Sequence, residues 1–199
     1  MINKVGISFL LAILSSVLFV QCTDAQSNQL PVTDKAKNSG QQHGPYNLAS
    51  SLQLFDDGSN RGYLVVKVDI DQGSYIYSMS QKKPLQPTKI KVEPSKSFRL
   101  LGAFKSDRPA KVIEKDPVFE QRVEKHEGTI QFFAPIELAQ GVDHKKLQAK
   151  VVFNGQVCSD MGCRPIQNVK STASFVGYIK APARQAAANA GQNNQANRR

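Results

Sequence analysis

The 199-residue sequence lacks the residue patterns of several common enzyme classes. It has no serine–histidine–aspartate order of the kind that hydrolases use, no glycine-rich phosphate loop and no prominent pair of carboxylates. Its three histidines, His43, His126 and His144, lie in polar or charged segments, which predicts surface positions for all three. The few cysteines, three in all, remain as the candidates for chemistry.

Long apolar runs are also rare. The run from Val5 to Val20 follows a lysine and is shorter than the roughly 20 residues that a membrane-spanning helix needs. A small-residue site that ends at Ala25 follows it, so cleavage before Gln26 is expected. The sequence therefore predicts a signal peptide over 1–25, a periplasmic or secreted location and no transmembrane span in the mature chain.

Cys22 leaves a second interpretation open, a lipoprotein anchor. The residue before a lipidated cysteine should be small, and Gln21 is not, so cleavage after Ala25 is favoured. That cleavage leaves Cys158 and Cys163 in the mature chain. An even number of cysteines in an oxidising compartment permits one disulfide.

Acidic residues are outnumbered, with 16 against 26 basic ones, which gives a formal net charge of +10. The tail from Lys180 contains no acid, whereas 46–179 mixes both signs. The sequence offers no basic helix and no stacking platform of aromatic and arginine side chains, so no nucleic-acid partner is expected. A basic surface can still steer association with an acidic partner.

Composition divides the chain into four parts, of which the signal peptide is the first. Residues 26–45 are polar and lack apolar periodicity, which predicts a flexible linker. Residues 180–199 are Ala, Gln and Asn with scattered Arg, which predicts a disordered basic tail. Residues 46–179 remain, a length typical of one domain with one core.

Alternation of apolar and polar residues predicts short β-strands in this domain. Every second residue from Leu64 to Ile70 is apolar, and the same period of two recurs in 88–92, 130–132, 149–153 and 175–179. Turn-forming pairs are expected between strands: Asp57-Gly58, Gln72-Gly73, Lys83-Pro84, Glu93-Pro94, Asp116-Pro117, Gln140-Gly141 and Asn154-Gly155. The pattern predicts an all-β protein, an immunoglobulin-like antiparallel β-sandwich, with a helical turn only at 143–148.

Cys158 and Cys163 are separated by four residues, and Gly162 favours a tight loop that brings the sulfurs to disulfide distance. Spacing alone leaves three roles open: a redox-active disulfide, a structural staple and, with Met161, a soft-sulfur site for Cu(I). Closing a loop of about 6 residues stabilises a fold by about 2 kcal/mol, against nearly 5 for about 100 residues. A domain of this size has little need of so weak a staple, and a short exposed loop gives an attacking thiolate access.

The segment Gln156 to Pro165 resembles the active-site segment of the N-terminal domain of the thiol:disulfide interchange protein DsbD. There a strand ends in Gln-x-Cys and a short loop leads to a second Cys followed by Pro. Gly73 to Ser78 resembles the family's Gly-x-x-(Ile/Leu)-Tyr strand, and Asp116 to Glu120 resembles its acidic, aromatic cap loop. The three segments occur in the family's order, and the likeness covers roughly 46–179.

The resemblance implies an immunoglobulin-like domain that accepts electrons from a membrane-embedded partner and passes them to periplasmic thioredoxin-like proteins. Cys163 would form the mixed disulfide with a partner, and Cys158 would resolve it. Tyr75 and Tyr77 would wall the site and Phe119 would cap it, with ordinary core packing as the alternative for all three aromatics. No cofactor and no metal is expected.

The sequence departs from the family pattern in three ways. The cysteines are separated by one residue fewer than in the best-known members, and Arg164 stands where the family has an apolar or aromatic residue. Arg164 is predicted to lower the pKa of the Cys163 thiol through its positive charge. The family's transmembrane channel and thioredoxin domain are missing from the sequence, so a membrane electron donor on another chain is expected.

Together these features predict a thiol-disulfide oxidoreductase of the protein-disulfide reductase type. The alternative is a non-catalytic β-sandwich interaction module in which the disulfide is structural.

Overall fold

The structure is a computed structural model, and it describes residues 41–42 and 44–182. The predicted signal peptide 1–25 lies outside the described residues, as do Cys22, His43 and most of the predicted linker and tail. Every regular element in the described part is a β-strand. None of these residues belongs to a helix long and apolar enough to cross a membrane.

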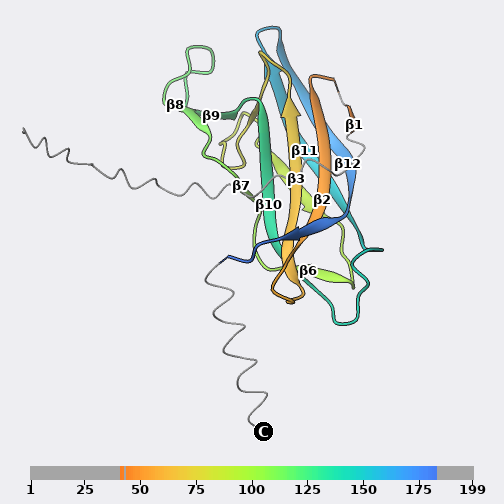
Figure 1. Ribbon diagram of the computed structural model, residues 1–199. Coiled ribbons are helices and arrows are strands. Elements are labelled where there is room, and N and C mark those ends of the chain that lie inside the picture. The colour runs from red at the N-terminus through yellow and green to blue at the C-terminus, as the bar shows by residue number, and fades with distance from the viewer. Residues whose placement is uncertain (1–40, 43, 183–199) are drawn as a thin grey trace, which may run out of the picture.

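The described residues form twelve strands, of which the long ones, β2, β3, β10, β11 and β12, run along most of the domain (Figure 1). Their bounds are β1 Gln41–Gln42, β2 Tyr46–Phe55, β3 Arg61–Ile70, β4 Tyr75–Tyr77, β5 Lys89–Val92, β6 Phe98–Leu100, β7 Lys105–Ser106, β8 Lys111–Ile113, β9 Val123–His126, β10 Thr129–Leu138, β11 Gln148–Ser159 and β12 Gly162–Ile179. Two of the residues in the predicted linker thus pair with β2 as β1.

The strands hydrogen-bond in the order β6-β10-β3-β2-β12-β11-β4-β9-β8, and β1, β5 and β7 pair with β2, β11 and β10. The predicted all-β, immunoglobulin-like fold class is confirmed. One pair departs from the antiparallel expectation, because β12 runs parallel to β2, with Phe175 opposite Leu52. The first long strand and the last therefore lie side by side.

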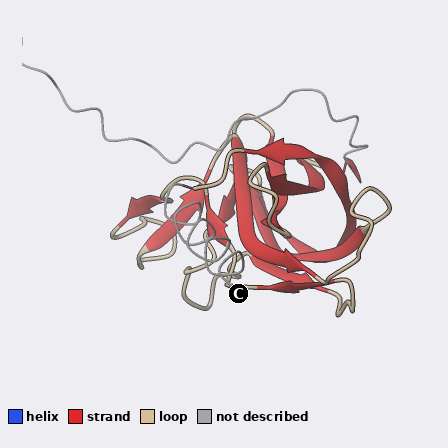
Figure 2. Cartoon of the chain, turned by 60° about the horizontal axis from the view of Figure 1, so that its bottom comes forward, coloured by secondary structure: helices blue, strands red, loops and turns tan. Residues whose placement is uncertain are grey.

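The sheet folds over, so that its two halves share one core. Phe132 on β10 and Phe153 on β11 have ring centroids 6.4 Å apart, although three strands separate β10 from β11 in the hydrogen-bonded order. Figure 2 shows the strands curving around this core. Alternation supplies the inward faces: Leu64, Val66 and Val68 of β3 are fully buried, as the period of two predicts.

The turn predicted at Asn154-Gly155 is wrong, because both residues lie inside β11. The register between β11 and β12 shifts here, and the Asn168 backbone N–H donates to Oδ1 of Asn154 at 2.8 Å. A bulge of this kind accommodates the turn-forming residues without ending the strand. Glycine suits the position because a Cβ on Gly155 would lie 3.3 Å from the Cα of Thr88.

His126 also corrects the sequence-based expectation, because its side chain is only 3% exposed. β9 pairs with β4, which turns the imidazole inward against the ring of Phe132 at a centroid distance of 5.8 Å. Burial, with a smaller contribution from Arg108, lowers the pKa of His126. His144 is half-buried in the predicted helical turn, where Lys146 N–H donates to the Asp143 carbonyl at 3.1 Å.

Candidate functional site

Cys158 and Cys163 lie directly opposite each other at the end of the β11–β12 hairpin and form a disulfide. The last paired residues are Ser159 and Gly162, so the connection is a two-residue turn of the kind that joins tight hairpins. Gly162 has a φ of +122°, which disfavours any residue with a side chain. This glycine therefore allows the chain to return at once and places the second cysteine against the first.

The two cysteines of this disulfide differ in exposure. Cys158 is 2% exposed and belongs to a buried cluster with Tyr77, Leu85 and Val123, whereas Cys163 is exposed. The difference follows from position, since β4 pairs with β11 at Cys158 and brings Tyr77 of the cluster against it, while the start of β12 stands at the tip of the hairpin. A molecule that approaches from solvent can therefore reach the sulfur of Cys163 first.

Tyr77 joins the site from β4, and its side chain is fully buried. Its hydroxyl oxygen lies 3.6 Å from Sγ of Cys158 and 3.9 Å from Sγ of Cys163. Because neither sulfur of a disulfide carries a hydrogen, the hydroxyl is the donor in these contacts. Burial, followed by the neighbouring Tyr75, raises the pKa of Tyr77, so the hydroxyl keeps its proton at neutral and mildly alkaline pH.

Tyr75 lies two residues before Tyr77 on β4, on the same face of the strand, and is the register partner of Cys158. Its ring meets that of Tyr77 edge to face, with centroids 5.6 Å apart. Nζ of Lys125 lies 4.4 Å from the centre of the Tyr75 ring, a cation–π arrangement, and 2.8 Å from a Glu127 carboxylate oxygen. The two tyrosines and the two cysteines thus form one continuous group of side chains.

Phe119 lies in the loop between β8 and β9 and packs, partly buried, against the cluster that contains Cys158. Oδ1 of Asp116 accepts the N–H groups of Val118 at 2.9 Å and Phe119 at 3.1 Å, and its carbonyl accepts that of Glu120 at 2.8 Å. The loop is therefore held by its own hydrogen bonds. Val118, at its outer face, is 77% exposed.

Glu124 holds the segment that follows Tyr77, a role that the sequence reasoning did not identify. Its carboxylate accepts hydrogen bonds from the hydroxyls of Ser78, at 2.9 Å, and Ser80, and it pairs with Arg122 at 3.1 Å. The hydrogen bond from Ser80, more than that from Ser78 or the charge of Arg122, lowers the pKa of Glu124. Ser78 follows Tyr77 directly, and no local sequence pattern links it to a residue 46 positions away.

Arg164 is exposed on β12 next to Cys163, and its register partner is Val157. Neighbouring side chains of a strand point to opposite faces, so Arg164 and Cys163 diverge. An effect of Arg164 on the thiol's pKa stays a prediction. Met161 is 97% exposed in the turn, and while the sulfurs are joined neither is the thiolate that Cu(I) would need.

No protein-family model matches the sequence, and no curated protein matches it. Solved structures that resemble the chain include the N-terminal domain of DsbD from Neisseria meningitidis in the reduced form. That domain is 21% identical with a TM-score of 0.41, and the alignment covers 67% of this chain and 90% of that one.

The N-terminal periplasmic domain of ScsB from Proteus mirabilis is a second similar structure. It is 15% identical with a TM-score of 0.44, and the alignment covers 84% of this chain and 56% of that one. At these values the likeness concerns the fold. The function proposed below is argued from the side chains of this protein.

Proposed function

We propose that this protein is a thiol-disulfide exchange domain that relays electrons through Cys158 and Cys163. The observation that carries the proposal is the asymmetry of the disulfide: Cys163 is exposed, whereas Cys158 is 2% exposed and contacts the Tyr77 hydroxyl. Exchange proceeds through a mixed disulfide with one thiol while the second waits to resolve it. One accessible and one protected sulfur suit these two roles.

In the reduced domain, the Cys163 thiolate attacks a partner disulfide and forms a mixed disulfide, and one partner sulfur leaves as a thiolate. The Cys158 thiolate then attacks Sγ of Cys163, and the second partner sulfur leaves. Two electrons pass to the partner, and the Cys158–Cys163 disulfide forms again. A dithiol donor on another chain returns the domain to its reduced state by the reverse exchange.

Tyr77 is suited to stabilise a developing thiolate on either cysteine, because its hydroxyl lies within 4 Å of both sulfurs and keeps its proton. Phe119 is suited to restrict access to Cys158, because its ring packs against the cluster around that residue. Tyr75 packs beside Tyr77 and completes the wall. In these roles the three aromatic side chains keep the packing contacts described above.

A purely structural disulfide is the competing function. Eleven register pairs already join β11 to β12, and the bond links two residues that the hairpin holds opposite each other. Such a bond adds little constraint to the folded hairpin. Because its loop is short, it also lowers the conformational entropy of the unfolded chain only slightly. This weak contribution to stability favours exchange chemistry over a staple.

The partners we propose are periplasmic thioredoxin-like proteins as acceptors and a membrane protein on another chain as donor. An exported location is part of the proposal, and a disulfide persists in such an oxidising compartment. Mass spectrometry of the exported protein should show a chain that begins at Gln26. Detection of a lipid-modified N-terminal Cys22 instead would contradict this cleavage and favour a lipoprotein anchor.

Partner trapping tests the proposed function. Cys158→Ser should accumulate mixed disulfides on Cys163 in non-reducing pull-downs from periplasmic extract, because the resolving thiol is missing. Cys163→Ser should trap far less, because the remaining thiol is buried. The double variant Cys158→Ser/Cys163→Ser is the control, and equal trapping by both single variants would contradict the division of roles.

A further inference from the structure

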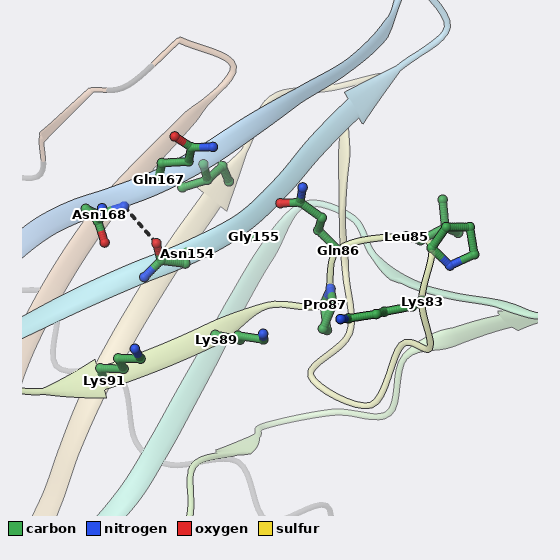
Figure 3. Close-up of a pocket in the computed structure, with 12 residues that line it drawn as sticks. Lys83, Leu85, Gln86, Pro87, Lys89, Lys91, Asn154, Gly155, Gln167 and Asn168 are labelled. Atoms are coloured by element: carbon green, nitrogen blue, oxygen red, sulfur yellow. Dashed lines mark hydrogen bonds between the residues drawn. The ribbon is translucent and has the colours of Figure 1, made fainter.

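A pocket of about 550 Å³ lies beside the cysteine hairpin. Lys89 and Lys91 of β5, with Lys83 of the loop before it, line one side, and Asn154 and Asn168, at the bulge between β11 and β12, line the other (Figure 3). The bulge brings these amide side chains to the pocket, since a bulge re-aims the side chains at its position. The pocket thus has a cationic wall and a hydrogen-bonding wall.

The positive charge of this pocket is not neutralised within the described part of the chain. Lys83, Lys89 and Lys91 are exposed, and no described carboxylate forms an ion pair with any of them. The twelve residues that line the pocket include no aspartate and no glutamate. The pocket is therefore complementary to an anionic group.

The pocket is also coupled to the redox site. Leu85 lines the pocket and packs in the buried cluster that contains Cys158. Asn154 lines it from β11, four residues before Cys158 and on the same face of that strand, which corresponds to about 13 Å along an extended strand. A protein–protein interface of about 800 Å² per partner reaches about 15 Å from its centre. A protein that is bonded to Cys163 and forms an interface of this size can therefore reach the pocket.

We propose that the lysine pocket, defined by Lys83, Lys89 and Lys91, docks an acidic surface segment of the redox partner that exchanges with Cys163. The inference rests on the proposed function and adds the charge of the partner surface to it. Opposite charges beside the reacting sulfur raise the rate of encounter and fix the orientation of approach. The amides of Asn154 and Asn168 can donate hydrogen bonds to the same carboxylates.

The test compares two cysteine peptides, each activated as a mixed disulfide with thionitrobenzoate, that carry either a glutamate tail or a glutamine tail. Reduced protein converts each to peptide thiol and coloured thionitrobenzoate, while its two thiols become the Cys158–Cys163 disulfide, so atoms and electrons balance. The glutamate peptide should react faster at low ionic strength. Added salt should remove this advantage.

The pocket variant is Lys83→Gln/Lys89→Gln/Lys91→Gln. Its rate with the glutamate peptide should fall by about tenfold, as expected for the loss of three exposed ion pairs of ordinary strength, while its rate with the glutamine peptide stays unchanged. The matched control is Lys96→Gln/Lys145→Gln/Lys180→Gln, which removes the same charge from positions outside the pocket lining. It should keep most of the preference for glutamate.

Reaction with the glutamine peptide reports on the proposed function, and the ratio of the two rates reports on docking, so the two can fail separately. Binding of a labelled, cysteine-free glutamate peptide to the oxidised protein, measured by fluorescence anisotropy, tests docking even if neither peptide reacts. Equal loss of binding in the pocket and control variants would overturn the proposal. Tighter binding of an acidic oligosaccharide than of the peptide would also overturn it.

Discussion

The hydroxyl of Tyr77 lies 3.6 Å from the buried sulfur of Cys158, which is 81 positions away in sequence. The same hydroxyl is 3.9 Å from Sγ of Cys163, so one proton donor serves both members of the pair. β4 makes this possible, because it adds to the edge of β11 at the cysteine itself. The hydroxyl therefore remains within reach of whichever sulfur carries negative charge during exchange.

Replacing Tyr77 by Phe should slow thiol chemistry with little effect on the fold. The variant keeps the ring and loses the donor, so the thiolate is less stabilised and the pKa of the Cys163 thiol rises. Alkylation of the reduced protein by iodoacetamide at neutral pH should slow several-fold, and the rate profile should move to higher pH. Unfolding free energy should change by about 1 kcal/mol.

Tyr63→Phe is the matched control for that measurement, because Tyr63 packs between Phe55 and Phe133 with centroid distances of 5.3 and 5.4 Å. Its alkylation profile should follow the wild-type curve. A Tyr77→Phe profile that also follows the wild-type curve would remove the hydroxyl from the mechanism.

Truncating Phe119 to Ala should expose Cys158. The loop keeps its hydrogen bonds to Asp116, but the ring that packs on the Cys158 cluster is lost. Reduction by a small thiol such as dithiothreitol should become several-fold faster, at a cost of about 1 kcal/mol in stability. Val118→Ala changes an exposed residue of the same loop and should leave the rate unaltered. Equal rates for Phe119→Ala and the wild type would assign the ring to packing alone.

Reduction of the Cys158–Cys163 bond should leave the domain folded. The bond closes a loop of about 6 residues, which contributes about 2 kcal/mol against the roughly 5–15 kcal/mol of a typical domain. Thermal unfolding followed by circular dichroism should give a melting temperature lower by several degrees in reductant. Complete unfolding on reduction would favour the structural role, because an electron carrier must persist in both redox states.

His126 should make the domain less stable in mild acid. Burial, with Arg108 second, lowers the pKa of His126 in the folded state, while Asp107 and Glu124 act in the opposite direction. Below about pH 6.5 this histidine therefore binds a proton in the unfolded chain but not in the folded chain. Stability is fully present above that pH and falls as pH decreases towards the lower folded pKa, by at most about 1.4 kcal/mol per pH unit.

Urea unfolding of wild type and His126→Gln between about pH 5 and 7 measures this dependence. The variant should have a lower stability at neutral pH, through lost packing against Phe132, and a flatter pH profile. An unchanged slope would assign the acid sensitivity to other groups.

Much of the fold is determined by the sequence itself. A strand places the alternate residues along Leu64 to Ile70 on one face, whereas a helix would scatter residues of period two around its axis, so this strand and the sandwich could be predicted. The cysteine pair could be predicted as well, because its spacing and Gly162 are local. The prediction of a turn at Asn154-Gly155 is wrong because local propensity contains no information on the pairing of β11 with β5 on one side and β12 on the other.

Only the tertiary structure decided which sulfur is buried and what surrounds it. The burial of Cys158 depends on the pairing of β4 with β11, and the burial of His126 depends on the pairing of β9 with β4. The lysine pocket, likewise, joins β5 to a bulge more than sixty positions away. Each of these is a contact between segments far apart in sequence, and periodicity reports which face of a strand is buried without naming the strand that buries it.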